Sequence, residues 1–168
     1  DQKTFKMLAK CFYGFEEILS EELLSLGAQK IQIGRRNVSF YGDKGFMYKA
    51  NLSLRTALKI LKPISEFKFS DINSFYEKIY KIKWESLLGV DSTFIINSSV
   101  FHSKIFNNSK FTSLKAKDAI VDRFRNKFAK RPNIDAKNPD LKIDIHINKN
   151  TCTISLDSSG ESLHKRGY

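Results

Sequence analysis

The sequence predicts an α+β protein made of two parts, and three observations support this. Residues 1–67 show strand-like and helix-like periodicity in the order β-α-β-β-α-β, which is typical of a ferredoxin-like split βαβ unit. Residues 68–158 show further strand patterns around one long amphipathic helix at 113–132. The chain has 168 residues, of which 41% are hydrophobic, so it can form one large or two small domains with real cores.

The first part is expected to contain six elements. The first helix has acidic residues in its first turn and Gly27 after its last apolar residue, which are start and stop signals. Arg35 and Arg36 separate two alternating strands and predict a hairpin with a basic tip. Pro63 favours an edge or a bulge of the last strand. In chain order we expect a strand at 5–12, a helix at 15–26, strands at 30–34 and 37–41, a helix at 43–56 and a β-rich run at 57–69.

The second part is expected to alternate helices and strands. Ser70 and Asp71 form a good helix cap, and Pro132 ends the long helix because it has no N–H to donate. The apolar stripe of that helix is predicted from Leu114, Ile120, Val121, Phe124 and Phe128. In chain order we expect a helix at 72–82, a turn at 84–88, a strand at 93–101, a loop at 102–112, the helix at 113–132, a connection at 133–141, and strands at 142–147 and 151–157.

The positive charge is concentrated in one segment. The net charge of the chain is +11, and residues 102–132 hold nine basic and two acidic side chains, whereas residues 68–101 and 133–168 are each neutral in sum. Clustering of this kind indicates a polyanionic partner more strongly than the total charge does. The alternative for a single charged helix is a solvated amphipathic surface, which is the common case.

The sequence shows no pattern of a catalytic or metal site. The histidines are scattered, no glycine-rich phosphate loop occurs, and no Gly-x-Ser-x-Gly motif is present. Asp118 and Asp122 share a helix face, but the basic residues around them predict ion pairs rather than an acid/base pair. Cys11 and Cys152 read as small core residues of a reducing compartment, with a single disulfide as the alternative.

The location expected from the sequence is the cytoplasm. The N-terminus has no secretory signal pattern, and no apolar run reaches the length of a membrane-spanning helix. We therefore expect no membrane partner.

Four segments resemble one family of RNA-modifying enzymes. Residues 9–28 (AKCFYGFEEILSEELLSLGA) and 50–57 (ANLSLRTA) resemble the start of THUMP-containing RNA methyltransferases. Residues 117–124 (KDAIVDRF), followed by Arg131 and Pro132, resemble the THUMP signature helix. The tail at 155–168 (SLDSSGESLHKRGY) resembles the junction that leads into the catalytic domain of bacterial large-subunit ribosomal RNA guanine-N2 methyltransferases, often labelled N6-adenine-specific DNA methylases.

The resemblance implies a ferredoxin-like N-terminal domain at 1–67 packed against an α/β THUMP RNA-binding domain at 68–158. It also implies that 159–168 is a linker into an absent Rossmann-like methyltransferase domain that binds S-adenosylmethionine. That domain carries an Asn/Asp-Pro-Pro-Tyr motif, which this sequence lacks, because its three prolines are never adjacent. The fragment is therefore expected to have no cofactor and no enzymatic activity of its own, and to position ribosomal RNA for the parent's methyltransferase domain.

Three alternatives remain open from the sequence. Relatives with this front end also act on transfer RNA, so the chain could be the THUMP region of a transfer RNA methyltransferase. The old family label suggests a fragment of a DNA-modifying enzyme. A basic protein-interaction domain without an enzymatic role is the third.

The candidate RNA-binding residues are the basic side chains of the central segment, the hairpin tip and the tail. Phe106 and Phe111 lie between the basic residues and are candidates for stacking on unpaired bases, although a buried loop anchor is the commoner role of such phenylalanines. No metal ligands are predicted. The basic candidates are Lys104, Lys110, Lys115, Lys117, Arg123, Arg125, Lys127, Lys130, Arg131, Arg35, Arg36, Lys165 and Arg166.

Overall fold

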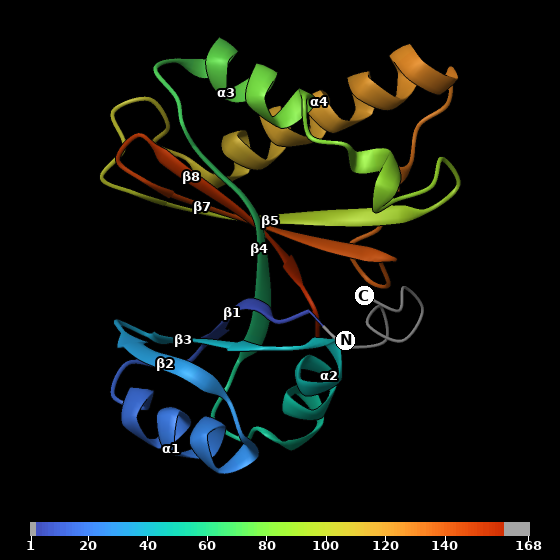
Figure 1. Ribbon diagram of the computed structural model, residues 1–168. Coiled ribbons are helices and arrows are strands. Elements are labelled where there is room, and N and C mark those ends of the chain that lie inside the picture. The colour runs from blue at the N-terminus through green and yellow to red at the C-terminus, as the bar shows by residue number, and fades with distance from the viewer. Residues whose placement is uncertain (1–2, 160–168) are drawn as a thin grey trace. The chain divides into compact units, whose positions relative to one another are not determined.

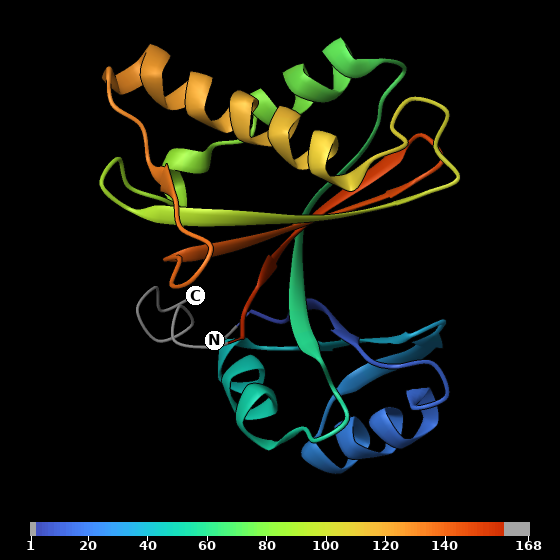
Figure 2. The same ribbon diagram turned by 180° about the vertical axis from the view of Figure 1, so that it is seen from behind.

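The computed structural model describes residues 3–159, so Lys165 and Arg166 lie outside the described residues. The chain divides into two compact units (Figures 1 and 2). Of the described residues, the first unit comprises 3–63 and 157–159, and the second is Ile64–Leu156. Strand β4 (Lys59–Lys68) therefore begins in the first unit and ends in the second.

The first unit has the predicted element order and a ferredoxin-like sheet. Strand β1 lies between β3 and β4 and is antiparallel to both, and the sheet order of the unit is β2-β3-β1-β4. The ladder between β1 and β4 ends at Leu61, two residues before Pro63. The elements are β1 (Phe5–Lys10), α1 (Glu16–Leu26), β2 (Gln29–Gly34), β3 (Asn37–Gly42), α2 (Lys44–Ser53) and the start of β4.

The helices of the first unit begin and end where local chemistry requires it. Gly27 has φ 102° and ends α1, since its N–H reaches back to carbonyls of the last turn. The Asp43 carboxylate caps α2 by accepting a hydrogen bond from the Phe46 N–H at 2.7 Å. Both helices lie on the same face of the β1–β3 sheet (Figure 1). Their apolar sides and the strands enclose a core that includes Met7, Leu19, Leu23, Val38, Phe40, Met47 and Ile60.

The second unit is an α/β sheet with helices on one face (Figures 1 and 2). Strand β5 is parallel to β7 and β6, β7 is antiparallel to β8, and the order is β8-β7-β5-β6. The prediction of buried isoleucines along β7 is confirmed, because Ile143, Ile145 and Ile147 are all buried. The elements are α3 (Ile72–Tyr80), a 3-10 turn η1 (Trp84–Ser86), β5 (Thr93–Phe101), α4 (Ser109–Phe128), β6 (Asn133–Ile134), β7 (Leu141–Asn148) and β8 (Thr151–Asp157).

Helix α3 begins at the predicted cap. The Asp71 carboxylate accepts a hydrogen bond from the Ser74 N–H at 2.7 Å, and the Ser74 hydroxyl accepts one from the Asp71 N–H at 3.2 Å. This reciprocal pair is a capping box, with serine in the place of the usual Glu or Gln. The following turn is fixed by the buried Trp84, whose indole N–H donates to the Ile79 carbonyl at 2.9 Å. These bonds fix the surface against which α4 packs.

The start of α4 was predicted wrongly. We expected a loop at 102–112 and a helix from Ser113, but the helix begins at Ser109. The Asn108 side-chain oxygen accepts hydrogen bonds from the N–H groups of Lys110 and Phe111, at 2.8 and 3.2 Å. It therefore satisfies two donors of the first turn, and the helix starts four residues earlier than its large apolar residues suggest. The connection after α4 also contains the short strand β6.

The buried face of α4 differs from the predicted stripe. Ile120, Val121 and Phe124 are buried as expected, but Leu114 and Phe128 are about half exposed (48% and 47%). Most of the other buried residues of α4 are small, and a helix surface without large side chains can approach its neighbours closely. The further buried residues of α4 are Thr112, Ala116, Ala119 and Arg123.

Both cysteines are buried and free, so the disulfide alternative is wrong. Burial raises the pKa of the Cys152 thiol to about 12 and also raises the pKa of Cys11. Neither thiol is activated as a nucleophile, and both act as small core residues, as the sequence predicts.

Candidate nucleic-acid interface

Helix α4 carries six of the eleven candidate cations that the structure describes, and several candidates on it or just beyond it are already engaged within the protein. Lys117 forms an ion pair with Asp118 at 3.1 Å, which confirms the predicted pairing of that aspartate. The Lys127 ammonium lies 3.4 Å from Glu85, and Lys130 lies 3.9 Å from Asp91. Asp122 accepts a hydrogen bond from the Tyr76 hydroxyl of α3, a partner that the sequence did not suggest. Burial and this hydrogen bond raise the pKa of Tyr76.

Arg123 points into the protein. Only 7% of the residue is exposed, and its Nε and Nη2 atoms donate to the two Glu85 carboxylate oxygens at 2.7 and 2.9 Å. Its Nη1 atom donates to the Tyr80 carbonyl at 2.8 Å. The hydrogen bond from Arg123 lowers the pKa of Glu85 to about 2, and that of Arg123 is raised by the same bond. This arginine therefore connects α4 to the end of α3 and the following turn.

The two candidate aromatic residues differ in exposure. Phe106 is 1% exposed and packs against Phe69 and Phe75, with ring centroids 5.8 and 4.7 Å away. The structure therefore places Phe106 in the role of a buried anchor. Phe111 is 40% exposed, lies 6.0 Å from Phe106, and has the Lys115 ammonium 5.6 Å from its ring centroid.

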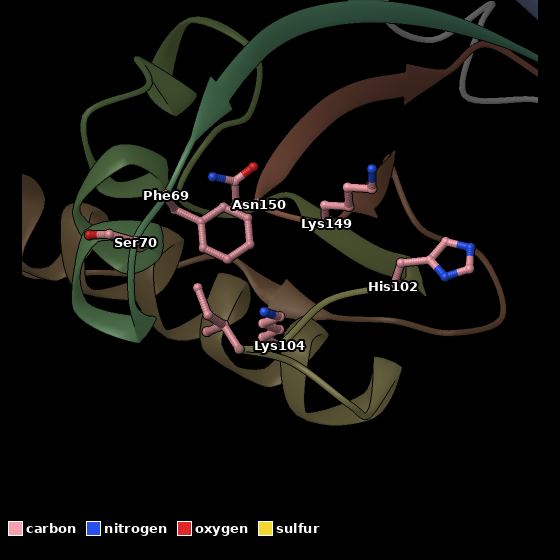
Figure 3. A pocket seen from close by; sticks show the side chains of 7 residues that line it. Phe69, Ser70, His102, Lys104, Lys149 and Asn150 are labelled. Atoms are coloured by element: carbon pink, nitrogen blue, oxygen red, sulfur yellow. The ribbon is translucent and has the colours of Figure 1, made fainter.

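A pocket of about 460 Å³ opens beside this aromatic cluster (Figure 3). Its lining comes from three segments that are far apart in sequence: the residues after β4, the loop between β5 and α4, and the turn between β7 and β8. The Phe69 N–H donates to the Asn150 carbonyl at 3.0 Å and so joins the residues after β4 to the turn between β7 and β8. The Lys149 N–H donates to the Phe101 carbonyl at 2.8 Å and so joins that turn to the end of β5. The lining residues are Phe69, Ser70, His102, Lys104, Ile105, Lys149 and Asn150.

The pocket combines an apolar base with exposed basic side chains at its edge. Phe69 is 2% exposed and forms part of the core beneath it, whereas His102, Lys104 and Lys149 are exposed side chains. Within residues 3–159, no ion pair or side-chain hydrogen bond engages the Lys104 or Lys149 ammonium groups or the His102 ring. His102 and Lys149 both have left-handed backbone, with φ of 56° and 57°, so the two loops turn sharply at these positions. A neighbouring hollow shares Lys149 and Asn150 but also contains Glu66, and is less suited to an anion.

The pocket and the first turn of α4 belong to the same end of the second unit. Phe69 packs on Phe106, and Phe106 packs on Phe111 of that first turn. Lys110 precedes Phe111, and the Lys110 ammonium group likewise has no ion pair or hydrogen bond among the described residues. Lys104, Lys110 and Lys149 are therefore three unpaired cations at one end of the domain, and we call them the basic rim. Arg125 is also unpaired within the described chain but lies about 22 Å further along the helix axis.

The remaining sites lie elsewhere in the chain. Arg35 and Arg36 occupy the predicted hairpin tip between β2 and β3 of the first unit. The Arg131 Nε donates to the Pro132 carbonyl at 2.9 Å, just beyond α4.

No cluster of three or more potential metal ligands occurs among residues 3–159. None of the helices in that range is long and apolar enough to cross a membrane.

The fold and this basic surface define a ferredoxin-like domain followed by an α/β domain with exposed cations. Each of the two domains matches a known family. The THUMP domain family matches residues 69–157, more than half of the chain, and the RlmL ferredoxin-like domain matches residues 6–61. The chain belongs to the THUMP domain family, and the family resemblance seen in the sequence is confirmed.

Longer proteins share this arrangement. Ribosomal RNA large subunit methyltransferase K/L of Syntrophotalea carbinolica (strain DSM 2380 / NBRC 103641 / GraBd1) is 39% identical over 163 residues, which are 97% of this chain and 23% of that protein. A predicted N6-adenine-specific DNA methylase from Listeria monocytogenes str. 4b F2365 is 27% identical, with a TM-score of 0.77 over 99% of this chain and 43% of that one. SMU.472, assigned as a methyltransferase and crystallised with SAH, is 25% identical, with a TM-score of 0.77 over 94% and 42%. The chain thus spans less than a quarter of the length of this curated relative.

Proposed function

We propose that this chain is the RNA-binding and substrate-positioning module of an S-adenosylmethionine-dependent methyltransferase that modifies guanine N2 in 23S ribosomal RNA. The observation that carries the proposal is its 39% identity, over nearly its whole length, with a ribosomal RNA large subunit methyltransferase. The presence of a THUMP domain agrees with a role in RNA binding.

The basic rim supplies the physical basis for binding a polyanion. Lys104, Lys110 and Lys149 have no neutralising partner among the described residues, so their field reaches into solvent. Asp118 lies beside Lys117 and Asp91 beside Lys130, so these acids offset part of the field of the two lysines. Glu85 lies 3.4 Å from Lys127 but is also the partner of Arg123, so it offsets the Lys127 charge only in part. We therefore propose that RNA phosphates contact the basic rim, and that the C-terminal half of α4 contributes less.

The proposal predicts a definite salt dependence. Three phosphate contacts give a slope of about −2 for the logarithm of affinity against the logarithm of salt, at about −0.7 per contact with single-stranded nucleic acid. A fourfold rise in salt should therefore weaken binding by about 20-fold. Fluorescence anisotropy of a labelled RNA hairpin from 23S ribosomal RNA, titrated with the chain at several salt concentrations, measures this slope.

Paired variants locate the contact surface. Lys104→Ala with Lys149→Ala leaves one contact, so the same rise in salt should cost only about 3-fold. At low salt this pair should lose roughly 10-fold in affinity, because each exposed ion pair contributes up to about 1 kcal/mol. The matched control is the triple change Lys127→Ala, Lys130→Ala and Arg131→Ala, which removes more charge but should cost less affinity. A larger loss from the triple variant would place the interface at the C-terminal end of α4 instead.

The choice of nucleic acid separates the remaining alternatives. Preference for the ribosomal hairpin over transfer RNA and over duplex DNA supports the proposed substrate. Tighter binding to transfer RNA would support a transfer RNA methyltransferase, and tighter binding to duplex DNA would support a DNA-modifying enzyme. No binding to any nucleic acid would leave a basic protein-interaction domain.

The chemistry of methyl transfer is assigned to the rest of the longer protein. The curated relative is more than four times as long as the part matched here, and this chain covers only 42% of the solved chain that binds SAH. We propose that the S-adenosylmethionine site, the catalytic residues and the partner methyltransferase domain belong to that remaining length.

A further inference from the structure

The turn between β1 and α1 exposes aromatic rings to solvent. Phe12, Tyr13 and Phe15 are 63%, 68% and 44% exposed, although they lie within four residues of one another. The Phe12 and Phe15 rings contact each other edge to face, with centroids 6.5 Å apart. Exposed rings add little to folding stability, so a cluster of three indicates that this surface binds something.

The same turn is held rigidly against the hairpin tip of β2 and β3. The Glu16 carboxylate accepts hydrogen bonds from the Gly14 N–H at 2.8 Å and the Arg36 N–H at 2.9 Å. The Cys11 N–H donates to the Arg36 carbonyl at 2.9 Å, and the Phe15 N–H donates to the Phe12 carbonyl at 3.1 Å. Gly14 has φ 94°, a conformation that favours glycine, so the turn between the rings is fixed by its sequence. A surface fixed before binding loses less entropy when a ligand docks.

The charge beside the rings selects the kind of ligand. The Arg35 guanidinium carbon lies 5.8 Å from the Tyr13 ring centroid, and Arg36 follows it at the hairpin tip. The Glu16 carboxylate accepts bonds from backbone N–H groups, which lower its pKa, and it offsets part of the arginine charge without an ion pair to either guanidinium group among the described residues. Flat rings next to guanidinium groups suit a ligand with a planar face and a negative charge, which describes an unpaired nucleotide.

We propose that Phe12, Tyr13 and Phe15, with Arg35 and Arg36, form a stacking platform for unpaired nucleotides of RNA. The bases stack on the exposed rings, and the arginines contact the neighbouring phosphates. This inference rests on the proposed RNA-binding function, and it adds a contact in the first unit that is chemically distinct from the basic rim. Its signature is dependence on the bases, whereas the basic rim depends on phosphate charge.

The test compares two oligonucleotides with the 168-residue chain. One is a single-stranded RNA, and the other has the same backbone with abasic residues in its central positions. The variant carries Phe12→Leu and Tyr13→Leu, which keep the apolar character but remove the flat rings. We expect it to bind the intact RNA at least about 10-fold more weakly, with an unchanged salt slope and little change for the abasic strand. Tyr48→Leu, which removes another exposed aromatic ring of the first unit, is the control and should leave both affinities unchanged.

The outcomes separate this inference from the proposed function. If the leucine variant binds both strands as the wild type does while the Lys104/Lys149 variant is weakened, the platform is overturned and the RNA-binding function stands. Equal weakening of the intact and abasic strands would also overturn stacking. If the wild-type chain binds no RNA at all, the proposed function fails and the platform fails with it. An ultraviolet-induced cross-link from 4-thiouridine in the RNA to the peptide that contains Tyr13 would independently support the platform.

Discussion

Replacing Arg123 should damage the fold far more than it damages RNA contacts. The Arg123→Ala change removes the hydrogen bonds to both Glu85 oxygens and the one to the Tyr80 carbonyl. Breaking a fully buried ion pair costs about 3–5 kcal/mol, but the Glu85 side chain is 26% exposed and keeps Lys127 at 3.4 Å. We therefore expect a loss of about 2–3 kcal/mol in the free energy of unfolding, in line with hydrogen bonds to charged groups.

The structure provides both the assay and the control for this prediction. Trp84 is the only tryptophan, it is buried, and it precedes Glu85, so its fluorescence during urea unfolding reports on this part of the second unit. Arg125→Ala is the matched control, because that side chain lies two residues away and is exposed, and it should change stability by less than about 0.5 kcal/mol. A double-mutant cycle with Glu85→Ala should give a coupling energy of about 1–2 kcal/mol.

Two results would refute the reasoning. Equal and small losses of stability for Arg123→Ala and Arg125→Ala would show that the ion pair does not hold α4. A weakened affinity for RNA in a well-folded Arg123→Ala protein would return Arg123 to the nucleic-acid surface, where the sequence first placed it.

Three further predictions concern the core, acid stability and the cofactor. Phe124→Ala should lower the free energy of unfolding by about 3–5 kcal/mol in denaturant melts, because the ring is 1% exposed, and a loss below 1 kcal/mol would contradict its buried position. The pKa of Glu85 is lowered to about 2 from 4.5, so its contribution is complete above pH 4.5 and is lost as the pH falls towards 2. Urea melts across that range should show a loss of about 1–2 kcal/mol that is absent in Glu85→Gln, after allowance for partial solvent screening. Isothermal titration calorimetry should detect no stoichiometric binding of S-adenosylmethionine to this chain, and a clear binding isotherm would contradict the assignment of the cofactor to the longer protein.

Local patterns predicted most elements, because the signals that define them are short in range. The alternation along β7 placed Ile143, Ile145 and Ile147 in the core, and Gly27 marked the end of α1. The error at the start of α4 has the same origin. The predicted stripe begins at Leu114, after the first turn, and Asn108 is one of several polar residues before it, so its local sequence does not distinguish a helix cap from a loop.

Contacts between distant segments could not be predicted in this way. Arg123 and Glu85 are 38 residues apart, and nothing in either local pattern indicates that they meet. The pocket is a similar case, since its lining comes from segments around Phe69, Lys104 and Lys149 that the sheet brings together. The turn that contains Lys149 was expected between the strands at 142–147 and 151–157, but the left-handed backbone at His102 and Lys149 belongs to single residues that no periodic pattern marks.

The distribution of charge along the sequence identified the basic domain, but it did not identify which basic side chains lack an acidic partner. Lys149 belongs to a segment whose net charge is zero, and it is not among the RNA-binding residues predicted from the sequence. Among the described residues, no acid forms an ion pair with the Lys149 ammonium, and the Asp135 and Asp140 carboxylates of the same segment accept backbone N–H bonds elsewhere. Lys117, in the segment of highest charge, is paired with its own neighbour. What a polyanion meets is the charge left over after internal pairing, and for that reason the basic rim, rather than the most basic stretch of sequence, is the surface to mutate first.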